Sequence, residues 1–455
     1  MLARAMDKPD PLSSEERAAE LARPRPRRGL PIAPSALPGA RNLPLAAEAR
    51  DVDRRSRPIY AVWEITLACD LACRHCGSRA GHGRPDELTT AECLDLVNQM
   101  ADLGVKEVTL IGGEAYLRED WLEIIRAIRA RGMICATTSG GRGLTAAIVA
   151  EAKAAGLMGA SISIDGDEAT HDRLRGVTGS YRSGFEAMKA IREQGLRLSC
   201  NTQINRLSMP ILGDILETIA AAGVRAWQIQ LTVPMGRAAD EPEILLQPHD
   251  LLELFPLLAT LKKRCDELGV RLWPGNNIGY FGPYESVLRG HNYRGHGGSC
   301  GAGRATLGIE ANGAIKGCPS LPTTPWTGGN IRDASLEDIW ERSEALRYTR
   351  DRTTRDLWGY CKSCYYAEEC MSGCTWTSFV TLGKPGNNPY CHHRAIEMAR
   401  VGKRERIVRV EQAPGQPFDH GIFEIVVEDT PPSPPPSPCT VTPASPLSSS
   451  PGDHP

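Results

Sequence analysis

The chain has 455 residues and a formal net charge of −2. Its length is enough for a large core and more than one domain. The near-neutral charge and the lack of a basic, aromatic-rich patch argue against nucleic-acid binding. No apolar run approaches the ~20 residues that cross a bilayer, and no signal-peptide core follows the N-terminus. We therefore expect a cytoplasmic protein without a membrane span.

The sequence contains 15 cysteines. In a protein without an export signal the thiols stay reduced, so clustered cysteines indicate metal sites rather than disulfides. Ten of the 15 fall into two groups, three within 69–76 and seven within 300–391. Four others lie in helix-like or strand-like runs, where cysteine packs as a small apolar residue. These four are Cys93, Cys135, Cys200 and Cys265.

In chain order, an Arg/Pro/Ala-rich segment without hydrophobic periodicity comes first, and we expect residues 1–57 to be disordered. Short β-branched runs then alternate with amphipathic stretches, which predicts a parallel sheet wrapped by helices. The predicted strands are 61–67, 106–111, 133–138, 159–164, 196–204 and 226–232. The predicted helices are 90–103, 119–131, 144–155, 180–194, 209–222 and 248–268, with Thr89, Thr90 and Asp250 as candidate N-terminal caps.

Six such strand–helix units predict an α/β fold with an incomplete, TIM-like (β/α)6 barrel. We place this barrel at 58–285. A cysteine-rich domain follows at 286–400 and a C-terminal extension at 401–429. The last segment, 430–455, is rich in proline and serine and is expected to be disordered.

Three cysteines, Cys69, Cys73 and Cys76, directly follow the first predicted strand. Three thiolates on one loop can hold three irons of a four-iron cluster and leave the fourth iron without a protein ligand. An open metal position is a place for chemistry. A zinc knuckle is the alternative, and it would need a fourth ligand such as His75 or His82. The CxxxCxxC spacing after a strand resembles the radical S-adenosylmethionine (SAM) superfamily, which uses a partial (β/α)6 barrel.

Gly112, Gly113 and Glu114 follow the second predicted strand. Paired glycines let the backbone approach a ligand closely, and a carboxylate suits an ammonium group. The run resembles the GGE motif of the superfamily, which receives the methionine amino group of SAM, although Ala115 stands where the family usually has proline. The resemblance implies further SAM contacts at strand ends, with the segment 233–237 near adenine. These candidates are Ser139, Ser163, Asp165, Asn201 and Gln230.

The second cysteine group has the spacing Cx12Gx4C, then CxxCx5CxxxC, then a final cysteine. This pattern resembles the SPASM domain of radical SAM enzymes that mature peptides and proteins, whereas a pair of structural zinc sites is the alternative. The resemblance implies two auxiliary [4Fe–4S] clusters. One would be held by Cys361, Cys364, Cys370 and Cys391, and the other by Cys300, Cys318 and Cys374. The fourth position of the latter is either an open iron or a non-cysteine group such as His296.

The resemblance implies an enzyme with three [4Fe–4S] clusters, one of which binds SAM. Such an enzyme cleaves SAM reductively to a 5′-deoxyadenosyl radical, which abstracts hydrogen from the substrate. It also implies oxygen sensitivity and a flavodoxin- or ferredoxin-type reductant. No general base stands out among Asp165, Glu285 and His296.

The leading hypothesis for the substrate is a ribosomally made peptide that is crosslinked, epimerised or oxidised. Because residues 1–57 are too short for a leader-binding module, we expect a separate leader-binding protein or a substrate without a leader. A small molecule or a tetrapyrrole precursor is the alternative substrate. A non-catalytic iron–sulfur electron carrier is a further alternative, but a carrier has no need for an open iron beside a Gly-Gly-Glu turn.

Overall fold

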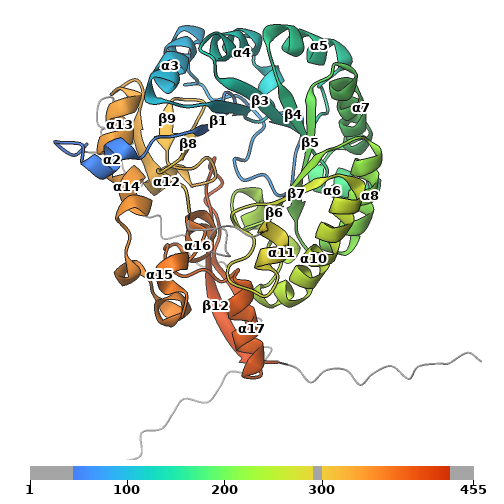
Figure 1. Ribbon diagram of the computed structural model, residues 1–455, viewed down its shortest axis with the longest axis vertical. Helices are drawn as coiled ribbons and strands as arrows, with labels where there is room; N and C mark the ends of the chain where they lie inside the picture. Colours follow the sequence, from blue (N-terminus) through green and yellow to red (C-terminus); the bar gives the residue numbers. More distant parts are fainter. Residues whose placement is uncertain (1–44, 291–299, 431–455) are drawn as a thin grey trace, which may run out of the picture. The chain divides into compact units, whose positions relative to one another are not determined.

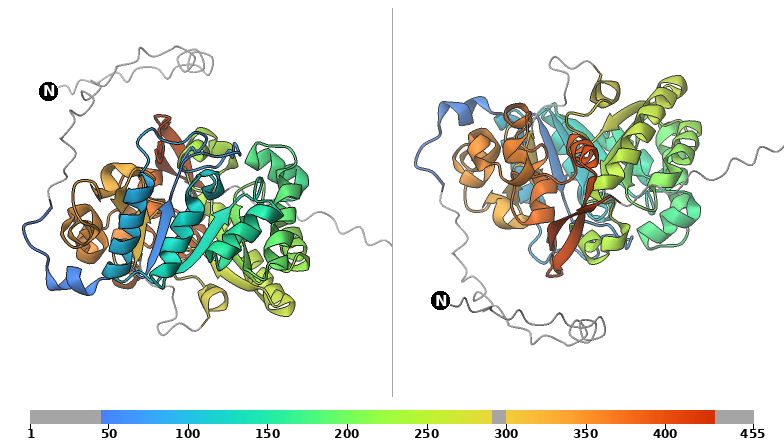
Figure 2. Two further views of the ribbon diagram at one scale, coloured as in Figure 1. Left: turned by 90° about the horizontal axis from the view of Figure 1, so that it is seen from above. Right: turned by 90° about the horizontal axis from the view of Figure 1, so that it is seen from below.

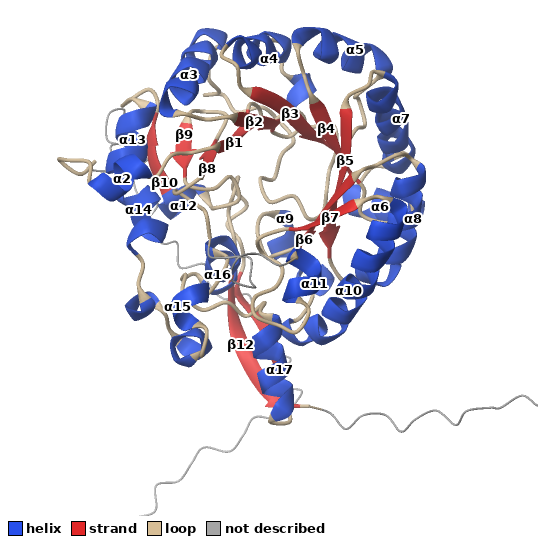
Figure 3. Cartoon of the chain, viewed as in Figure 1, coloured by secondary structure: helices blue, strands red, loops and turns tan. Residues whose placement is uncertain are grey.

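The computed structural model describes residues 45–290 and 300–430, which belong to one compact unit. Ten strands of this unit form a single sheet in the order β10-β9-β8-β1-β2-β3-β4-β5-β6-β7. Strands β1 to β8 pair in parallel, whereas β9 and β10 pair antiparallel. The parallel strands curve around a central space with helices outside them (Figures 1 and 3). This arrangement confirms the predicted partial barrel.

The first six barrel strands fall within a few residues of their predicted positions, and β7 follows them. They are β1 (Tyr60–Glu64), β2 (Glu107–Ile111), β3 (Ile134–Ser139), β4 (Gly159–Ser163), β5 (Arg197–Ile204), β6 (Ala226–Leu231) and β7 (Arg271–Pro274). The helices up to β7 are α2 (Asp51–Arg55), α3 (Thr90–Leu103), α4 (Trp121–Ala130), α5 (Ala146–Ala155), α6 (Glu168–Arg175), α7 (Ser180–Glu193), α8 (Leu212–Ala221), α9 (Arg237–Asp240) and α10 (Leu251–Leu268). Strand β7 and helices α2, α6 and α9 were not predicted.

Residue alternation along the strands decides which side chains face the helices. In β5 every second residue is buried against the surrounding helices, and the residues between them are less buried. At the start of α3, Thr89 and Glu92 form the reciprocal capping box that the sequence predicts. Asp250 does not cap α10 with its side chain, which instead accepts a bond from the Gln247 backbone nitrogen at 2.7 Å.

One helical stretch, Pro242–Leu268, is long and apolar enough to cross a membrane by length and composition alone. We expected from the sequence that the chain has no such run, and that expectation missed this stretch. In the structure, 56 % of its most apolar window is buried. That degree of burial is usual for a helix that packs into the core of a domain, and by itself this stretch is weak support for a membrane span.

The C-terminal part of the chain continues the barrel sheet, because β8 pairs with β1. The predicted domain boundary after residue 285 falls at the start of α11, and the sheet runs across it. The strands here are β8 (Thr306–Ile309), β9 (Ala314–Lys316), β10 (Thr327–Asn330), β11 (Lys403–Glu411) and β12 (Ile422–Asp429). The helices are α11 (Glu285–Arg289), α12 (Thr323–Trp326), α13 (Leu336–Arg342), α14 (Glu344–Asp351), α15 (Ala367–Cys370), α16 (Thr375–Leu382) and α17 (His392–Arg400).

Strands β11 and β12 form an antiparallel hairpin within the segment predicted only as an extension. The hairpin lies beside α17 (Figures 1 and 2). Arg394 of α17 pairs with Glu405 of β11 at 2.6 Å, and both side chains are almost completely buried. This buried ion pair ties the hairpin to the cysteine-rich region.

A cluster of three buried charges and the partly buried Arg84 joins the barrel to the strands that follow it. Arg84 lies 3.4 Å from Glu64 of β1 and 2.9 Å from Glu310, and Lys316 of β9 lies 2.8 Å from Glu310. The ammonium of Lys316 also sits 3.8 Å from the ring centroid of Phe418. Burial raises the pKa of Glu64 to about 7, although the charge of Arg84 opposes that rise. Because each charge has a partner in the cluster, β1, β8 and β9 depend on one another electrostatically.

The prediction that residues 1–57 are disordered is wrong for 45–57. Asp53 of α2 is completely buried, and its carboxylate lies 2.8 Å from Arg50, 2.8 Å from Arg347 and 3.0 Å from Arg350. A short polar helix of this kind has no hydrophobic periodicity of its own, so its order comes from partners about 300 residues away. The remaining predicted disordered segments, 1–44 and 431–455, lie outside the described residues, as do Cys439 and His296.

We expect Asp53→Ala to lower the free energy of unfolding by about 3–5 kcal/mol, because it leaves buried guanidinium groups without their counter-charge. Urea unfolding followed by circular dichroism measures this change. Asp51→Ala is the matched control, since the Asp51 side chain is 85 % exposed in the same helix, and a change of about 0.5 kcal/mol or less is expected there. Equal effects of the two substitutions would contradict the role of Asp53.

Candidate active site

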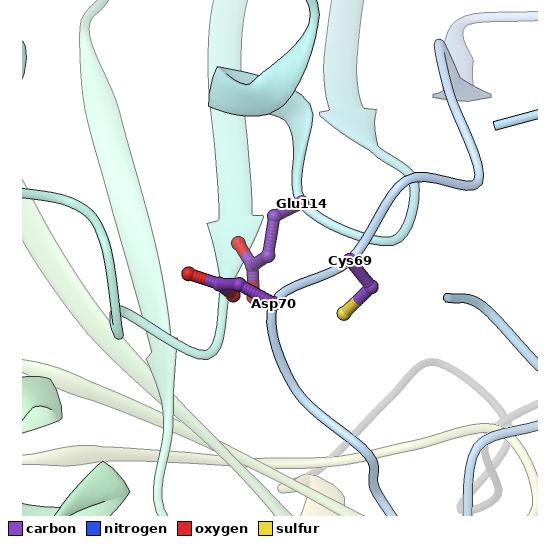
Figure 4. Close-up of side chains that lie close together, drawn as sticks. All are labelled: Cys69, Asp70 and Glu114. Carbon is purple, nitrogen blue, oxygen red and sulfur yellow. The ribbon is translucent and has the colours of Figure 1, made fainter. Parts of the chain in front are cut away.

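The loop that carries Cys69, Cys73 and Cys76 follows β1 and rests on the turn after β2. The backbone nitrogen of Gly113 donates to the Thr66 carbonyl, and that of Glu114 donates to the Ala68 carbonyl, each at 2.8 Å. The side chains of Cys69, Asp70 and Glu114 converge (Figure 4). Their ligand atoms all lie within 4.8 Å of one another. The two predicted motifs therefore form one site at the carboxyl ends of β1 and β2.

The glycines of this turn permit the contact between the two loops. A Cβ atom on Gly112 would lie 2.2 Å from the Thr66 carbonyl oxygen. On Gly113 it would lie 2.1 Å from the Ala68 carbonyl oxygen and 2.7 Å from Cβ of Cys69. Such distances are not possible between real atoms, so any larger residue would push the cysteine loop away from the turn.

Glu114 is the buried acid of the site, with 2 % of its surface exposed. Ser139 donates its hydroxyl to one carboxylate oxygen and the Gly140 backbone nitrogen donates to the other, both at 2.6 Å. Burial raises the pKa of Glu114 to about 7, and these two hydrogen bonds only partly offset that effect. A carboxylate held by neutral donors in a buried site is suited to receive a cationic group.

A second buried acid, Asp165, lies beyond the end of β4 and fixes the cysteine loop from another side. Its carboxylate lies 3.1 Å from Nε2 of His75 and 2.6 Å from Nη2 of Arg175. Arg175 also directs Nη1 at the sulfur of Cys73, at 3.7 Å. Burial raises the pKa of Asp165, but the charges of Arg175 and His75 outweigh it and hold the pKa below its usual range. Asp165, which was predicted as a SAM contact, is therefore already paired with side chains of the protein.

Arg175 was missed by the sequence analysis, although it lies ten residues after Asp165 and at the end of α6. Helix α6 also places His171 so that its Nδ1 accepts a hydrogen bond from the Asp165 backbone nitrogen at 3.1 Å. The i, i+4 spacing of His171 and Arg175 puts both on one helix face. That spacing after the Asp165–Gly166 strand exit is the signal that could have identified them.

The segment 233–237, predicted to pack near adenine, holds the cysteine loop from a third side. The backbone nitrogen of Arg237 donates to the Cys76 carbonyl at 3.0 Å, and its guanidinium donates to the carbonyls of Cys73, at 2.9 Å, and Ala80. Gly236 has φ +57°, and a Cβ atom there would lie 2.2 Å from the Cys76 carbonyl oxygen. The loop is thus fixed through its backbone, which leaves its thiols available as ligands.

The other predicted SAM contacts lie on neighbouring strands. Ser163 of β4 is in register with Asn201 of β5, and Gln203 of β5 is in register with Gln230 of β6. A cavity of about 510 Å³ occupies the interior of the barrel. Asn201 lines this cavity, whereas the three cysteines, Glu114, Ser163 and Gln230 do not. The structure therefore separates the cysteine–glutamate site from a polar chamber toward the amino ends of the strands.

Within each of the two predicted sets of later cysteines, the thiols affect one another electrostatically. Burial is the main cause that raises the pKa of the Cys374 thiol to about 12, and the thiols of Cys300 and Cys318 act in the same direction. Burial likewise raises the pKa of Cys391 to about 12, with smaller contributions from Cys361 and Cys364. The thiols of Cys391, Cys361 and Cys364 also act to raise the pKa of Cys370.

The chemistry of these donors fits iron–sulfur clusters. Soft thiolate ligands favour iron–sulfur clusters or zinc. His75, a candidate fourth ligand for zinc, is engaged by Asp165. Of the candidate general bases, Asp165 has the partners described above, Glu285 pairs with Arg289 at 2.9 Å, and His296 lies outside the described residues.

Comparisons with known proteins match both parts of the chain. The model of the radical SAM superfamily matches residues 63–223, and that of an iron–sulfur cluster-binding domain, SPASM, matches 300–365. The AdoMet-dependent heme synthase of Oleidesulfovibrio alaskensis is 30 % identical over 379 residues, covering 78 % of this chain and 92 % of that protein. The mycofactocin maturase MftC of Mycobacterium tuberculosis is 28 % identical, covering 85 % and 95 %.

Solved structures show the same fold. The crystal structure of SuiB from Streptococcus suis bound to S-adenosylmethionine has a TM-score of 0.57 at 17 % identity, over 74 % of this chain and 76 % of that chain. These findings confirm the resemblance on which the predictions of an enzyme, of SAM and of [4Fe–4S] clusters rest. The chain belongs to the radical SAM superfamily and is a radical SAM enzyme with a SPASM domain.

Proposed function

We propose that Cys69, Cys73 and Cys76 hold the [4Fe–4S] cluster that binds SAM, and that Glu114 receives the amino group of the methionine moiety. The convergence of Cys69 and Glu114 within 4.8 Å carries this proposal, because it puts an iron ligand and an ammonium-binding carboxylate at one place. When bound, the cluster and SAM supply the 5′-deoxyadenosyl radical that abstracts hydrogen from the substrate.

The residues of this chain would hold and orient these groups. Gly112 and Gly113 keep the cysteine loop against the turn, and Ser139 orients Glu114. Arg175 and Asp165 fix the loop near Cys73, and the guanidinium of Arg175 would lie beside the cluster. Ser163, Asn201 and Gln230 remain candidates for the carboxylate, ribose and adenine of SAM, since they lie on adjacent strands.

We assign two auxiliary [4Fe–4S] clusters to the later cysteines, which gives three clusters in total. The mutual effects of the thiols on their pKa values support this division, since Cys374 responds to Cys300 and Cys318, and Cys391 responds to Cys361 and Cys364. A flavodoxin- or ferredoxin-type protein would supply the electrons.

The proposed substrate is a ribosomally made peptide. The mycofactocin maturase MftC, which is similar to this chain over 85 % of the chain, supports a maturase function.

A tetrapyrrole is the second candidate, and the heme synthase of O. alaskensis, at 30 % identity, favours it. The two candidates differ in the charge that they bring to the site. A peptide needs neutral hydrogen-bonding partners, whereas a tetrapyrrole with propionate groups needs cationic ones.

Cys73→Ala is expected to abolish the release of 5′-deoxyadenosine from SAM under anaerobic, reducing conditions. The chain should lose about four irons and keep those of the SPASM domain. Liquid chromatography measures the nucleoside, and iron analysis measures the metal. Cys135→Ala, which changes a core cysteine of β3, should retain both. Release of 5′-deoxyadenosine by the Cys73 variant would refute the site assignment.

Glu114→Gln is expected to weaken SAM binding by roughly 10- to 100-fold, since a charge-assisted hydrogen bond contributes about 1.5–3 kcal/mol. The cluster iron should be unchanged, because Gln keeps the shape of the residue. Anaerobic equilibrium dialysis with labelled SAM gives the Kd. Glu119→Gln, a change at an exposed acid nearby, should bind SAM as the parent does. Equal affinities of the two variants would remove Glu114 from the site.

The substrate class can be tested by incubating the reduced enzyme and SAM with two compounds in separate reactions. One is a synthetic peptide encoded by a short reading frame beside the gene, and the other is an iron porphyrin with propionate side chains. We expect a mass change in the peptide together with 5′-deoxyadenosine, detected by mass spectrometry. Decarboxylation of the porphyrin with an unchanged peptide would favour the second candidate instead.

A further inference from the structure

A buried tyrosine, Tyr280, lies in the segment between β7 and α11. Tyr280 is 5 % exposed, and its hydroxyl has no hydrogen-bond partner within residues 45–290 and 300–430. A buried hydroxyl without a partner costs about 1–3 kcal/mol. Phenylalanine would fill the same space without the cost of an unpaired hydroxyl. The tyrosine hydroxyl therefore indicates a binding partner outside the described residues.

The phenol end of Tyr280 lies against the chain that carries one of the auxiliary cysteines. A Cβ atom on Gly373 would lie 2.5 Å from Cζ of Tyr280, and Gly373 directly precedes Cys374. The Cys391 thiol donates to the backbone carbonyl of Tyr280 at 3.7 Å. The phenol ring of Tyr280 therefore lies beside the segment that carries Cys374, and the backbone of Tyr280 lies beside Cys391.

The backbone around this position is strained on both sides. Tyr280 has φ +90° and Phe281 has φ +51°, and across the site Met371 and Ser372 have φ +51° and +59°. The described residues include six non-glycine residues with positive φ, and four of them are here. Each such residue costs of order 1–3 kcal/mol. Strain of this kind is retained where it puts a side chain in a required place.

The number of ligands shows which cluster lacks one. Cys361, Cys364, Cys370 and Cys391 give one auxiliary cluster four thiolates, whereas Cys300, Cys318 and Cys374 give the other three. A four-iron cluster has four positions for protein ligands.

We propose that the phenol oxygen of Tyr280 is the fourth protein ligand of the auxiliary cluster held by Cys300, Cys318 and Cys374. Phenolate is an established ligand of protein-bound iron. On binding, the O–H bond of Tyr280 breaks, its proton goes to solvent, and an O–Fe bond forms without any change in oxidation state.

The inference rests on the proposed auxiliary clusters and defines what one of them does. With a phenolate in the fourth position, every iron of that cluster has a protein ligand. The cluster then transfers electrons and does not bind the substrate directly. Neither the open iron nor His296, the two options that the sequence leaves for this position, is then required.

The test uses the full-length, anaerobically reconstituted protein with Cys69→Ala, Cys73→Ala and Cys76→Ala, so that only auxiliary clusters contribute to the spectra. Resonance Raman spectroscopy with visible excitation detects vibrations of a phenolate bound to iron. We expect these bands in this parent protein and their complete loss in the same protein with Tyr280→Phe. Electron paramagnetic resonance of the oxidised Tyr280 variant should show a three-iron signal, because one iron has lost its protein ligand.

Tyr390→Phe is the matched control. Tyr390 is also buried, but its hydroxyl already donates to the Leu246 carbonyl at 2.7 Å. The phenolate bands should persist in this variant and in His296→Ala. Circular dichroism of the Tyr280 variant should match that of its parent, because the substitution removes a hydroxyl that has no partner in the described fold.

Four results would each overturn the inference. If the parent contains about eight irons and lacks phenolate bands, or if Tyr280→Phe keeps them, Tyr280 is not a ligand while the three-cluster proposal stands. A shift in reduction potential without loss of such bands would mean a hydrogen bond to sulfur instead. A parent with about four irons would overturn the three-cluster proposal together with this inference.

Discussion

The close contact between the cysteine loop and the turn after β2 is the constraint on which the site depends. Two carbonyl oxygens, of Thr66 and Ala68, lie where side chains of Gly112 and Gly113 would otherwise be. The same carbonyls accept the backbone hydrogen bonds of that turn. Because the contact is made by backbone atoms, it brings Cys69 to Glu114 without using either side chain. The other contacts of the cysteine loop stabilise a position that Gly112 and Gly113 already determine.

Two buried acids near this loop have opposite electrostatic surroundings, and this difference separates ligand binding from structural support. Asp165 pairs with the guanidinium of Arg175 and with the ring of His75, and its pKa is lowered. Glu114 is held by neutral donors, and burial raises its pKa to about 7. A charge that lacks a counter-charge gains most from an arriving ammonium group. The sequence made both residues candidates because each follows a strand, and only the three-dimensional contacts distinguish them.

The alternation of strand-like and helix-like segments predicted the barrel from the sequence, since each of its first six strands is followed by a helix. Local patterning did not predict α2 or the pairing of β8 with β1. Asp53 is ordered by Arg347 and Arg350, far along the chain, and β8 has four residues, too few for a periodic signal. The cysteine spacing led to both of the proposed ligand sets. Arg175 and Tyr280 were missed because their importance comes from partners that fold next to them.

The continuity of the sheet couples the two halves of the enzyme. Strand β1 leads into the cysteine loop, and β9 ends two residues before Cys318. Strand β8 pairs with both of them, and Glu64, Arg84, Glu310 and Lys316 link the same strands through buried charges. A sheet held by hydrogen bonds and buried ion pairs does not hinge between adjacent strands. The separation between the SAM site and the nearer auxiliary cysteines is therefore fixed by the fold, which suits electron transfer between clusters better than a flexible linker would.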